Sequence, residues 1–490
     1  MPLPDRVFST VRTGTGAGDL RRALDVLTGP SLAHVVELVV WRSAPDALTV
    51  ANSAGSCRVT AGGHEPLEGQ DPLARQDPTA FAGVAAELAT PCPPPSVNHY
   101  PHAAARLWSA FAEPDRAPDI AVVHTDAHYW PDQQGHLGEH GSLGVLQSRA
   151  PLLLSGPGVT ARGLLSTSAR TVDVAPTLLA LAGLPVPDGL DGRPLVDAGS
   201  ADRVLGLLWD GANASALYDG AASGLLPNVA RLLERGCAYV GGAIAEFPSV
   251  TLVNHTCALT GVGPGRHGIV NNAYWDRTAQ QQILANDSTT WHVACDLLRP
   301  GVRTLWEMAG DIGTACVNEP IDRGAGYTTF GLVRAAATGD GTKSLAEALP
   351  PATGDPLASQ EFVAADRDYA WASQMDAVGL TQMLTLYGEE KPPRLAWWNT
   401  TLTDSAHHAG GAHSPIATAG LVDADRRLGV FLDLLVERDL LDGTAILLTA
   451  DHGMTHADPD CRGDWDQALA DAGVAVRDEA YGYLYLGVDV

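Results

Sequence analysis

The chain has 490 residues and a mass of 51.2 kDa, enough for about two to four domains of ordinary size. Hydrophobic residues make up 45% and charged residues 18%, which excludes a disordered or fibrous protein. The formal net charge of −26 argues against a nucleic-acid clamp, because such proteins neutralise phosphates with basic side chains. No apolar run approaches the roughly 18 residues of a membrane span, so we expect no membrane segment.

Seven cysteines are spread over the chain without a CxxC pair. An odd number with such spacing does not indicate a disulfide framework, so we interpret them as reduced thiols. We therefore expect a soluble, cytoplasmic protein. The sequence carries no indication of its oligomeric state.

Composition and hydrophobic pattern divide the chain into five predicted segments. A loop with four prolines (90–96) ends the first segment, and a Gly/Thr-rich stretch (335–343) marks an insertion able to cover a site. The predicted division is an accessory α/β subdomain (1–102), three core segments (103–200, 203–317 and 393–490) and a cap insertion (318–392).

Short β-rich runs that end in a polar or acidic residue recur along the chain. Continuous apolar runs of this kind are typical of strands covered on both faces, as in a parallel sheet. In chain order they are 120–124 before Asp126, 151–154 before Ser155, 204–209 before Asp210, 395–401 before Asp404, and 445–449 before Asp451.

Helical patterns alternate with these strands at 172–182, 228–235 and 425–437. The alternation predicts an α/β fold, a doubly wound and mostly parallel sheet with helices on both faces. In such folds the ligand site lies outside the carboxyl ends of the strands. The acidic residues that follow the strands are therefore expected at one edge of the sheet.

The densest motif is Phe247-Pro-Ser-Val-Thr-Leu-Val-Asn-His255, followed by His267-Gly-Ile-Val-Asn-Asn272. Thr251 stands just before a predicted helix, 255–260, whose N-terminus would lower the pKa of the hydroxyl and receive an anionic phosphoryl group. Asn272 could donate its amide N–H to a developing oxyanion. A threonine before a helix is also an ordinary N-cap, so this motif alone leaves both interpretations open.

Three strand endings carry metal-ligand residue types. Asp404 and His408 lie four residues apart, Asp451 precedes His452, and Asp210 precedes a glycine. Aspartate oxygen and histidine nitrogen suit Zn²⁺ or Mn²⁺. Together with a threonine at a helix N-terminus, these endings predict a metal-dependent site.

These motifs resemble the alkaline phosphatase superfamily, and within it the nucleotide pyrophosphatase/phosphodiesterase branch, over about residues 203–275 and 394–456. The resemblance implies that Thr251 is the nucleophile and that Asn272 binds the phosphoryl oxygen. It also implies two metal ions, most simply zinc. One ion would be held by Asp210, Thr251, Asp451 and His452, and the other by Asp404, His408 and a third histidine.

The third histidine departs from the family pattern, in which it follows the Asp-His-Gly segment within Gly-x-His-Gly. Here Gly138-Glu-His-Gly141 lies near the front of the chain, followed by 149–158 and 172–183, which resemble the closing segment of family members. We therefore expect a circularly permuted domain in which His140 completes the site and 103–200 is the displaced C-terminal part of the core. His136 is the alternative ligand.

Other histidines keep alternative interpretations. His407 adjoins His408 but does not have the Asp-x-x-x-His spacing. His124, Asp126 and His128 alternate along a strand end, so they share a face and form either a further metal set or a polar lining. His255, His413 and His456 are expected to orient neighbours or substrate.

The sequence thus predicts a two-metal hydrolase that cleaves a phosphodiester or pyrophosphate bond of a small-molecule ester through a phospho-threonine intermediate. A phosphomonoester or phosphonate hydrolase with the same site is one alternative, and a non-catalytic pseudo-phosphatase is another. The segments that would set specificity carry no motif. Tyr274 and Trp275 either stack on an apolar leaving group or pack internally.

Overall fold

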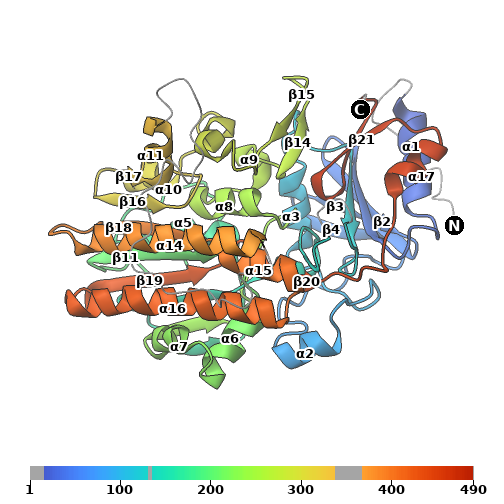
Figure 1. Cartoon of the computed structure of the whole chain (residues 1–490). Helices are drawn as coiled ribbons and strands as arrows, with labels where there is room; N and C mark the ends of the chain where they lie inside the picture. Colours follow the sequence, from blue (N-terminus) through green and yellow to red (C-terminus); the bar gives the residue numbers. More distant parts are fainter. Residues whose placement is uncertain (1–15, 131–134, 337–366, 489–490) are drawn as a thin grey trace.

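The computed structural model describes residues 16–130, 135–336 and 367–488 (Figure 1). Part of the predicted cap, 337–366, lies outside these residues. The fold is mixed α/β, as predicted, with two large sheets. Among the described helices, none is long and apolar enough to cross a membrane. All seven cysteines are free thiols.

The main sheet has eight strands, and its centre is buried on both faces. Five of its strand pairs are parallel, but β8 runs antiparallel to β19 and β12, so the parallel direction expected for 151–154 is wrong. In spatial order the strands are β17 (Tyr327–Thr328), β16 (Thr314–Val317), β18 (Leu395–Thr400), β11 (Arg203–Trp209), β19 (Thr444–Thr449), β8 (Leu152–Ser155), β12 (Gly236–Tyr239) and β9 (Gly163–Leu165).

A second sheet of seven strands is antiparallel throughout and includes the predicted strand 120–124, which therefore does not belong to the parallel sheet. The apolar run indicated a parallel strand because both faces of this strand are covered. Ala121 and Val123 belong to the largest hydrophobic core, while Ile120 and Val122 belong to a second core. The order is β21 (Val476–Glu479), β22 (Tyr483–Leu486), β5 (Ile120–His124), β1 (Val36–Ala44), β2 (Ala47–Asn52), β3 (Gly55–Thr60) and β4 (Gly63–Gly69).

This second sheet joins the two ends of the described chain. Its strands come from three of the predicted segments, 1–102, 103–200 and 393–490. The helix α1 (Gly16–Leu27) packs on α17 (Trp465–Asp471), and Figure 1 shows these blue and red helices side by side. Side chains between residues 23 and 51 therefore share a core with side chains between residues 465 and 484.

Helices flank the sheets, and three predicted ones are present as α5, α7 and α16. The predicted helix 425–437 begins earlier, at Pro415, because the Ser414 side chain accepts a hydrogen bond from the Ala417 N–H and proline suits a first helical turn. The helices are α1, α2 (Val84–Ala89), α3 (Ala103–Ala110), α4 (Val145–Ser148), α5 (Val174–Leu181), α6 (Ala214–Ser223), α7 (Pro227–Glu234), α8 (Thr251–Thr260), α9 (Pro264–His267), α10 (Leu305–Ala309), α11 (Thr329–Ala336), α14 (Arg367–Gly388), α15 (Leu402–Gly410), α16 (Pro415–Glu437) and α17.

Two elements within the predicted cap belong to the layers of the main sheet. The strand β17 pairs with β16, and α14 packs on β18 and α16. The described part of 318–392 therefore contributes to the core as well as to the rim above the sheet.

Small strand pairs bring distant segments to the edge of the main sheet. The pairing of β6 (Gly138–Glu139) with β20 (Thr455–His456) places Glu139 opposite Thr455. This pair sets the residues that follow β6 beside those that follow β19. The remaining short strands are β7 (Arg149–Ala150), β10 (Ala169–Arg170), β13 (Ala243–Ile244), β14 (Ala273–Asp276) and β15 (Gln281–Leu284).

Candidate metal centre and active-site cleft

Three adjacent parallel strands, β18, β11 and β19, deliver the predicted acidic ligands to one edge of the sheet. Asp210 follows β11, Asp451 follows β19, and Asp404 lies in the first turn of α15, just after β18. The carboxyl ends of neighbouring parallel strands meet at the same edge, so the three carboxylates converge. The predicted gathering is confirmed for these three aspartates and is wrong for Asp126, which follows β5 in the second sheet.

The first ligand cluster contains Asp210, Asp451 and His452. The Nε2 atom of His452 lies 3.2 Å from Oδ2 of Asp451 and 3.7 Å from Oδ1 of Asp210. The Gly211 N–H donates to Oδ1 of Asp451 over 3.0 Å, which fixes the orientation of that carboxylate. All three side chains are buried.

The second cluster joins the two distant halves of the chain. His140, Asp404 and His408 each offer a ligand atom, and these atoms all lie within 4.8 Å of one another. The ring of His140 stacks on that of His452 with centroids 3.8 Å apart, and its centroid is 5.1 Å from that of His408. The histidine encoded early in the chain thus meets ligands encoded more than 260 residues later.

The histidine tautomers leave one nitrogen of each ring for a ligand. Nδ1 lies 3.0 Å from the Ser249 carbonyl in His140, 2.7 Å from the Gly138 carbonyl in His408, and 3.0 Å from the Gly453 carbonyl in His452. Because a carbonyl only accepts, each Nδ1 carries the hydrogen and each Nε2 keeps its lone pair. Metal-ligating histidines are oriented in this way.

The electrostatics of the clusters also match a cation site. Burial, with the charges of Asp451 and Asp404, raises the pKa of Asp210 well above its usual range. Burial, with the charge of Asp451, raises the pKa of Asp404 to about 7. Burial lowers the pKa of His408 to about 4, so this imidazole is neutral at pH 7. Burial disfavours a charge on His452, but Asp451, Asp404 and Asp210 together raise its pKa. Clustered carboxylates beside imidazole nitrogens suit a divalent cation.

Buried polar atoms without a hydrogen-bond partner provide the direct test of this fit. Such atoms are normally rare in folded proteins. Four of them face the two clusters: Oδ1 of Asp210, Oδ1 of Asp404, Oδ2 of Asp451 and Nε2 of His452. The donor set therefore fits a divalent cation.

A buried acid–histidine pair, not anticipated from the sequence, supports the first cluster. Nδ1 of His255 donates to Oε2 of Glu319 over 2.9 Å, and Nε2 lies 3.7 Å from Asp210 and 3.6 Å from Asp451. Burial disfavours the charged ring, but Glu319, Asp210 and Asp451 together raise the pKa of His255 well above its usual range. These contacts agree with the predicted orienting role of His255. Glu319 was not predicted as a site residue, although it follows a strand, β16.

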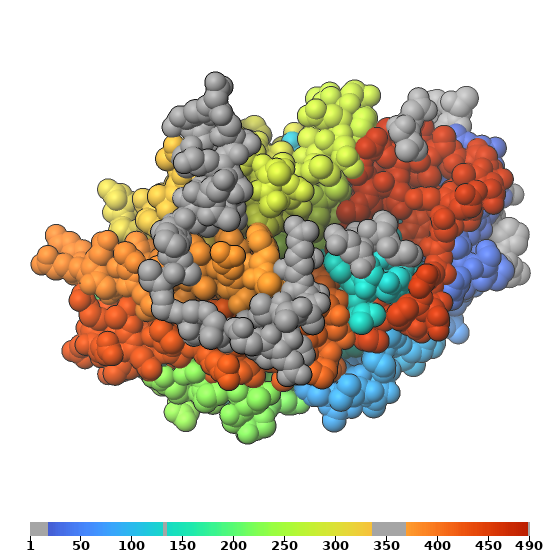
Figure 2. Space-filling model, viewed as in Figure 1, coloured from blue at the N-terminus to red at the C-terminus, as the bar shows by residue number. Residues whose placement is uncertain are grey.

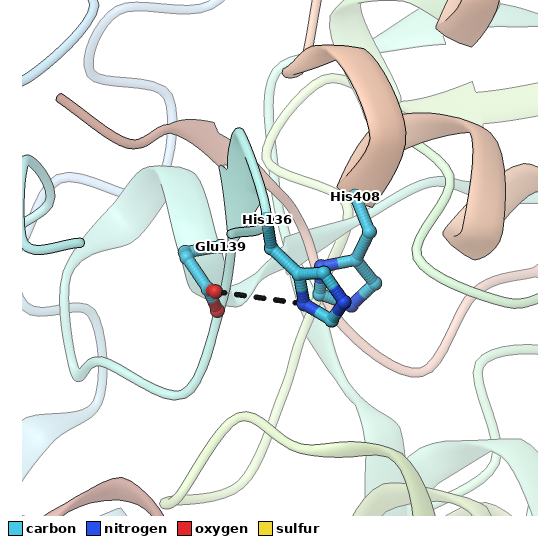
Figure 3. A group of neighbouring side chains, drawn as sticks. All are labelled: His136, Glu139 and His408. Carbon is cyan, nitrogen blue, oxygen red and sulfur yellow. Dashed lines mark ion pairs between the residues drawn. The ribbon is translucent and has the colours of Figure 1, made fainter. Parts of the chain in front are cut away.

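His136, the alternative to His140, lies at the outer side of the second cluster. Figure 3 shows its ring beside that of His408, with centroids 4.1 Å apart, and Glu139 pointing toward it from β6. Nδ1 of His136 is 3.7 Å from Oε1 of Glu139. His136, Glu139 and His408 also lie close enough to hold an ion. His140 is the histidine that faces Asp404.

Thr251 is the first residue of α8, which begins four residues before the predicted start at 255. Val250 occupies the N-cap position, so the interpretation of Thr251 as an N-cap is wrong. The side-chain oxygen of Asn272 accepts the Leu252 N–H over 3.1 Å, so the Asn272 side chain lies at the N-terminus of this helix. A hydroxyl, a helix N-terminus and an amide donor therefore lie together.

A cleft of about 490 Å³ opens over these groups. It is lined by His136, His140, Thr251, Asn272, Asn286, Ser288, Trp291, Trp371, Asp404, Ser405, His408, Ala409 and Tyr481. Tyr274 and Trp275 do not line it: Tyr274 is buried, and Trp275 packs under the Arg477 guanidinium. The cleft is lined instead by Tyr481, Trp291 and Trp371, which no motif marked, and the ring centroids of the two tryptophans are 6.2 Å apart.

Two sets of other candidates lie apart from the clusters. His124 contacts the backbone of the His140 segment, with Nε2 3.2 Å from the His140 carbonyl, while Asp126 faces Asn98. Among the described residues, His124, Asp126 and His128 do not come close enough to form a metal group. His413 pairs with Glu87 over 2.9 Å. The polar-lining interpretation of the first three residues is the one that agrees with this geometry.

A family model described as type I phosphodiesterase / nucleotide pyrophosphatase matches residues 204–489. Curated relatives include an uncharacterized pyrophosphatase/phosphodiesterase of Schizosaccharomyces pombe, 37% identical over 87 residues (17% of each chain), and venom phosphodiesterase 2 of Crotalus adamanteus, 26% identical over 231 residues (47% of this chain, 24% of the relative). The chain thus spans a quarter or less of the length of these relatives.

Solved structures with similarity to the chain include murine ectonucleotide pyrophosphatase/phosphodiesterase 5 in complex with AMP. The TM-score is 0.37 and the identity 18%, over 57% of this chain and 64% of that one. Phosphonoacetate hydrolase from Sinorhizobium meliloti in complex with phosphonoformate has a TM-score of 0.34 and 20% identity, over 54% and 59% of the two chains.

Proposed function

Because the chain belongs to the type I phosphodiesterase / nucleotide pyrophosphatase family, within the alkaline phosphatase superfamily, we propose that it is a two-metal hydrolase of phosphodiester or pyrophosphate bonds. The observation that carries the proposal is the meeting of His140, Asp404 and His408 with Asp210, Asp451 and His452. Thr251 lies at the same cleft.

The ligands would hold two divalent ions, for which we propose zinc because the donor set combines histidine nitrogen with aspartate oxygen. Asp210, Asp451, His452 and Thr251 would hold one ion, and Asp404, His408 and His140 the other. When bound, the ions supply Lewis-acid stabilisation of the attacking and leaving oxygens and lower the pKa of the threonine hydroxyl.

The chain's own groups then carry the displacement. Oγ1 of Thr251 forms the new bond to phosphorus as its proton is lost, and the bond from phosphorus to the leaving oxygen breaks. The leaving oxygen takes up a proton, and a phospho-threonine remains. Water then attacks this phosphorus, which restores the threonine hydroxyl. The N-terminus of α8 and the amide of Asn272 would stabilise negative charge on the non-bridging oxygens.

The cleft favours a diester over a monoester. Among the described residues that line it, none is lysine or arginine. A monoester presents a second negative charge on its non-bridging oxygens, which a cationic side chain would be expected to neutralise. A diester carries an ester group there instead, and Trp291 and Trp371 offer it an aromatic wall.

We also propose that the catalytic domain is circularly permuted. The family model matches residues 204–489, and His140 lies before this range. The ends of the described chain share one sheet and one core, the arrangement in which a permuted connection costs little.

Hydrolysis by the zinc-loaded protein tests the function. We expect turnover of bis-p-nitrophenyl phosphate that exceeds turnover of p-nitrophenyl phosphate, and no turnover by Thr251→Ala at unchanged metal content. Full activity of Thr251→Ala would refute the nucleophile. A preference for the monoester, or for a phosphonate, would support the alternative hydrolase, and a metal-loaded protein without turnover would indicate a pseudo-phosphatase.

A further inference from the structure

A buried glutamine links the loops that carry His140 and His452. Gln147 lies in α4, after His140 along the chain, and its side chain is fully buried. Its Oε1 accepts the Ser142 N–H over 2.8 Å, and its Nε2 donates to Oγ1 of Thr455 over 2.8 Å. Figure 2 shows turquoise atoms of the segment around β6 between orange and red atoms of the C-terminal half. One side chain therefore joins the segment that follows His140 to the segment that follows His452.

The partners of these two hydrogen bonds fix the orientation of the amide. A backbone N–H only donates, so the oxygen of the Gln147 amide faces Ser142 and its nitrogen faces Thr455. The Thr455 hydroxyl accepts this bond and can give its own hydrogen to the carbonyl of Asp126 at 3.2 Å or of Glu139 at 3.3 Å. A flipped amide would set two donors against each other at Ser142. The link therefore has a single arrangement.

The backbone of Gln147 holds the second of the two histidines. Its carbonyl accepts the Gly453 N–H over 2.9 Å, and the Gly453 carbonyl lies 3.0 Å from Nδ1 of His452 and orients that ring. The approach of the two backbones is close, because an added Cβ at Gly453 would lie 2.1 Å from the Leu146 carbonyl oxygen. Only glycine fits there. The residue that follows His452 is thus packed directly on α4.

His140 is held on its other side by the segment before α8. Oγ of Ser249 donates to the Ser142 carbonyl over 2.6 Å, and the Ser249 carbonyl accepts from Nδ1 of His140 over 3.0 Å. Ser142 thus fixes the loop to Gln147 through its N–H and to Ser249 through its carbonyl. The rings of His140 and His452, one from each cluster, stack with centroids 3.8 Å apart. Their separation therefore depends on the contacts of Gln147.

We propose that Gln147 is a positioning residue that fixes the separation of His140 and His452, and thereby the spacing of the two ions. The attacking and leaving oxygens of a displacement each need an ion at the right place, so a small error in spacing slows turnover even when both ions are bound. Gln147 itself belongs to neither cluster. The inference rests on the proposed function, because it takes both clusters to hold an ion.

Three variants and one control test this role. Gln147→Leu removes both side-chain hydrogen bonds and keeps a side chain of similar size. Thr455→Val removes one of these bonds with a smaller change in the core, and Thr455→Ser keeps the hydroxyl. Thr444→Val is the matched control, because Thr444 is also buried and its hydroxyl donates to the Leu440 carbonyl, at the opposite end of β19 from Asp451.

Three measurements separate ion spacing from metal affinity. Zinc affinity is measured against a competing chelator, and kcat and KM for bis-p-nitrophenyl phosphate are measured at zinc concentrations that fill both sites. Electron paramagnetic resonance of the protein loaded with two Mn²⁺ ions reports the magnetic coupling between them, which depends on their spacing and requires no turnover.

For Gln147→Leu we expect zinc to bind about 10- to 100-fold more weakly in the second cluster. With both sites filled, kcat should stay at least about ten-fold below that of the wild type at a similar KM, and the manganese coupling should change. Thr455→Val should change all three in the same direction, and the double variant should be no worse than Gln147→Leu, because both changes remove the same bond. Thr455→Ser and Thr444→Val should match the wild type.

Wild-type kcat and manganese coupling in Gln147→Leu with both sites filled would overturn the proposal, since the residue would then act on affinity alone. Additive losses in the double variant would also overturn it, because they indicate separate damage to the fold. If Gln147→Leu does not fold, Thr455→Val beside Thr444→Val gives the decision. A wild type that fills both sites without turnover would refute the hydrolase proposal alone, and the manganese coupling would then decide the role of Gln147.

Discussion

Metal affinity should depend steeply on pH, because protons and metal compete for the same carboxylates. In the metal-free protein the pKa of Asp404 is raised to about 7, chiefly by burial, and that of Asp210 is also raised well above its usual range, chiefly by burial. The pKa of His408 is lowered to about 4, so this ligand is already deprotonated. Burial disfavours the charged ring of His452, but the neighbouring aspartates raise its pKa, so the aspartates and His452 carry the competing protons.

The direction and the size of the pH dependence of zinc affinity follow from these pKa values. A ligand with a raised pKa must lose its proton before it binds, so affinity rises with pH. With a pKa of about 7, Asp404 is ionised in about one tenth of molecules at about pH 6 and about nine tenths at about pH 8. Zinc affinity should rise about ten-fold over this interval from Asp404 alone, about 1.4 kcal/mol, and Asp210 adds to this.

Zinc titration against a competing chelator, repeated across this pH range, measures the effect, with corrections for chelator protonation. Calorimetry in buffers of different ionisation enthalpy would show proton release on binding at the lower pH. Asp404→Asn should bind more weakly and lose part of the slope. Affinity that stays flat with pH, or proton uptake on binding, would refute the reasoning about these carboxylates.

Two further predictions concern buried polar groups. Glu319→Gln removes the charge that holds His255 against the first cluster, so zinc affinity should fall about 10- to 100-fold while the fold persists; unchanged affinity would show that the pair is only structural. Asp126→Asn removes an ionisable carboxyl whose pKa is raised by burial and by the charge of Glu37. Because such a group disfavours folding once it ionises, the wild type should lose stability as the pH rises above the usual range of aspartate, and the variant should be more stable near pH 8 by about 1 kcal/mol or more in denaturant unfolding.

Local patterns were sufficient for the ligands that follow the strands of the main sheet. A buried apolar run followed by aspartate predicts a strand of a parallel sheet, with the aspartate at the carboxyl edge of that sheet. Asp210, Asp404 and Asp451 could therefore be placed from the sequence. The same pattern gave the wrong sheet for 120–124. A strand that is covered on both faces has no polar face, whether its sheet is parallel or antiparallel.

Residues that act through distant contacts were not predictable. Tyr481 and Trp371 enter the cleft from elements that carry no motif, and only tertiary packing brings them there. Glu319 could have been found, since it follows a buried strand, β16, as the metal-binding aspartates follow theirs. The start of α8 at Thr251 was missed because the helix begins without a capping side chain.

The most direct test of the account is the metal stoichiometry of His140→Ala beside that of His136→Ala. If His140 completes the second cluster, the wild type and His136→Ala bind two zinc ions tightly and hydrolyse a phosphodiester, whereas His140→Ala binds one tightly and loses turnover. Two tightly bound ions and normal turnover in His140→Ala would contradict the two-metal centre assembled from both halves of the chain.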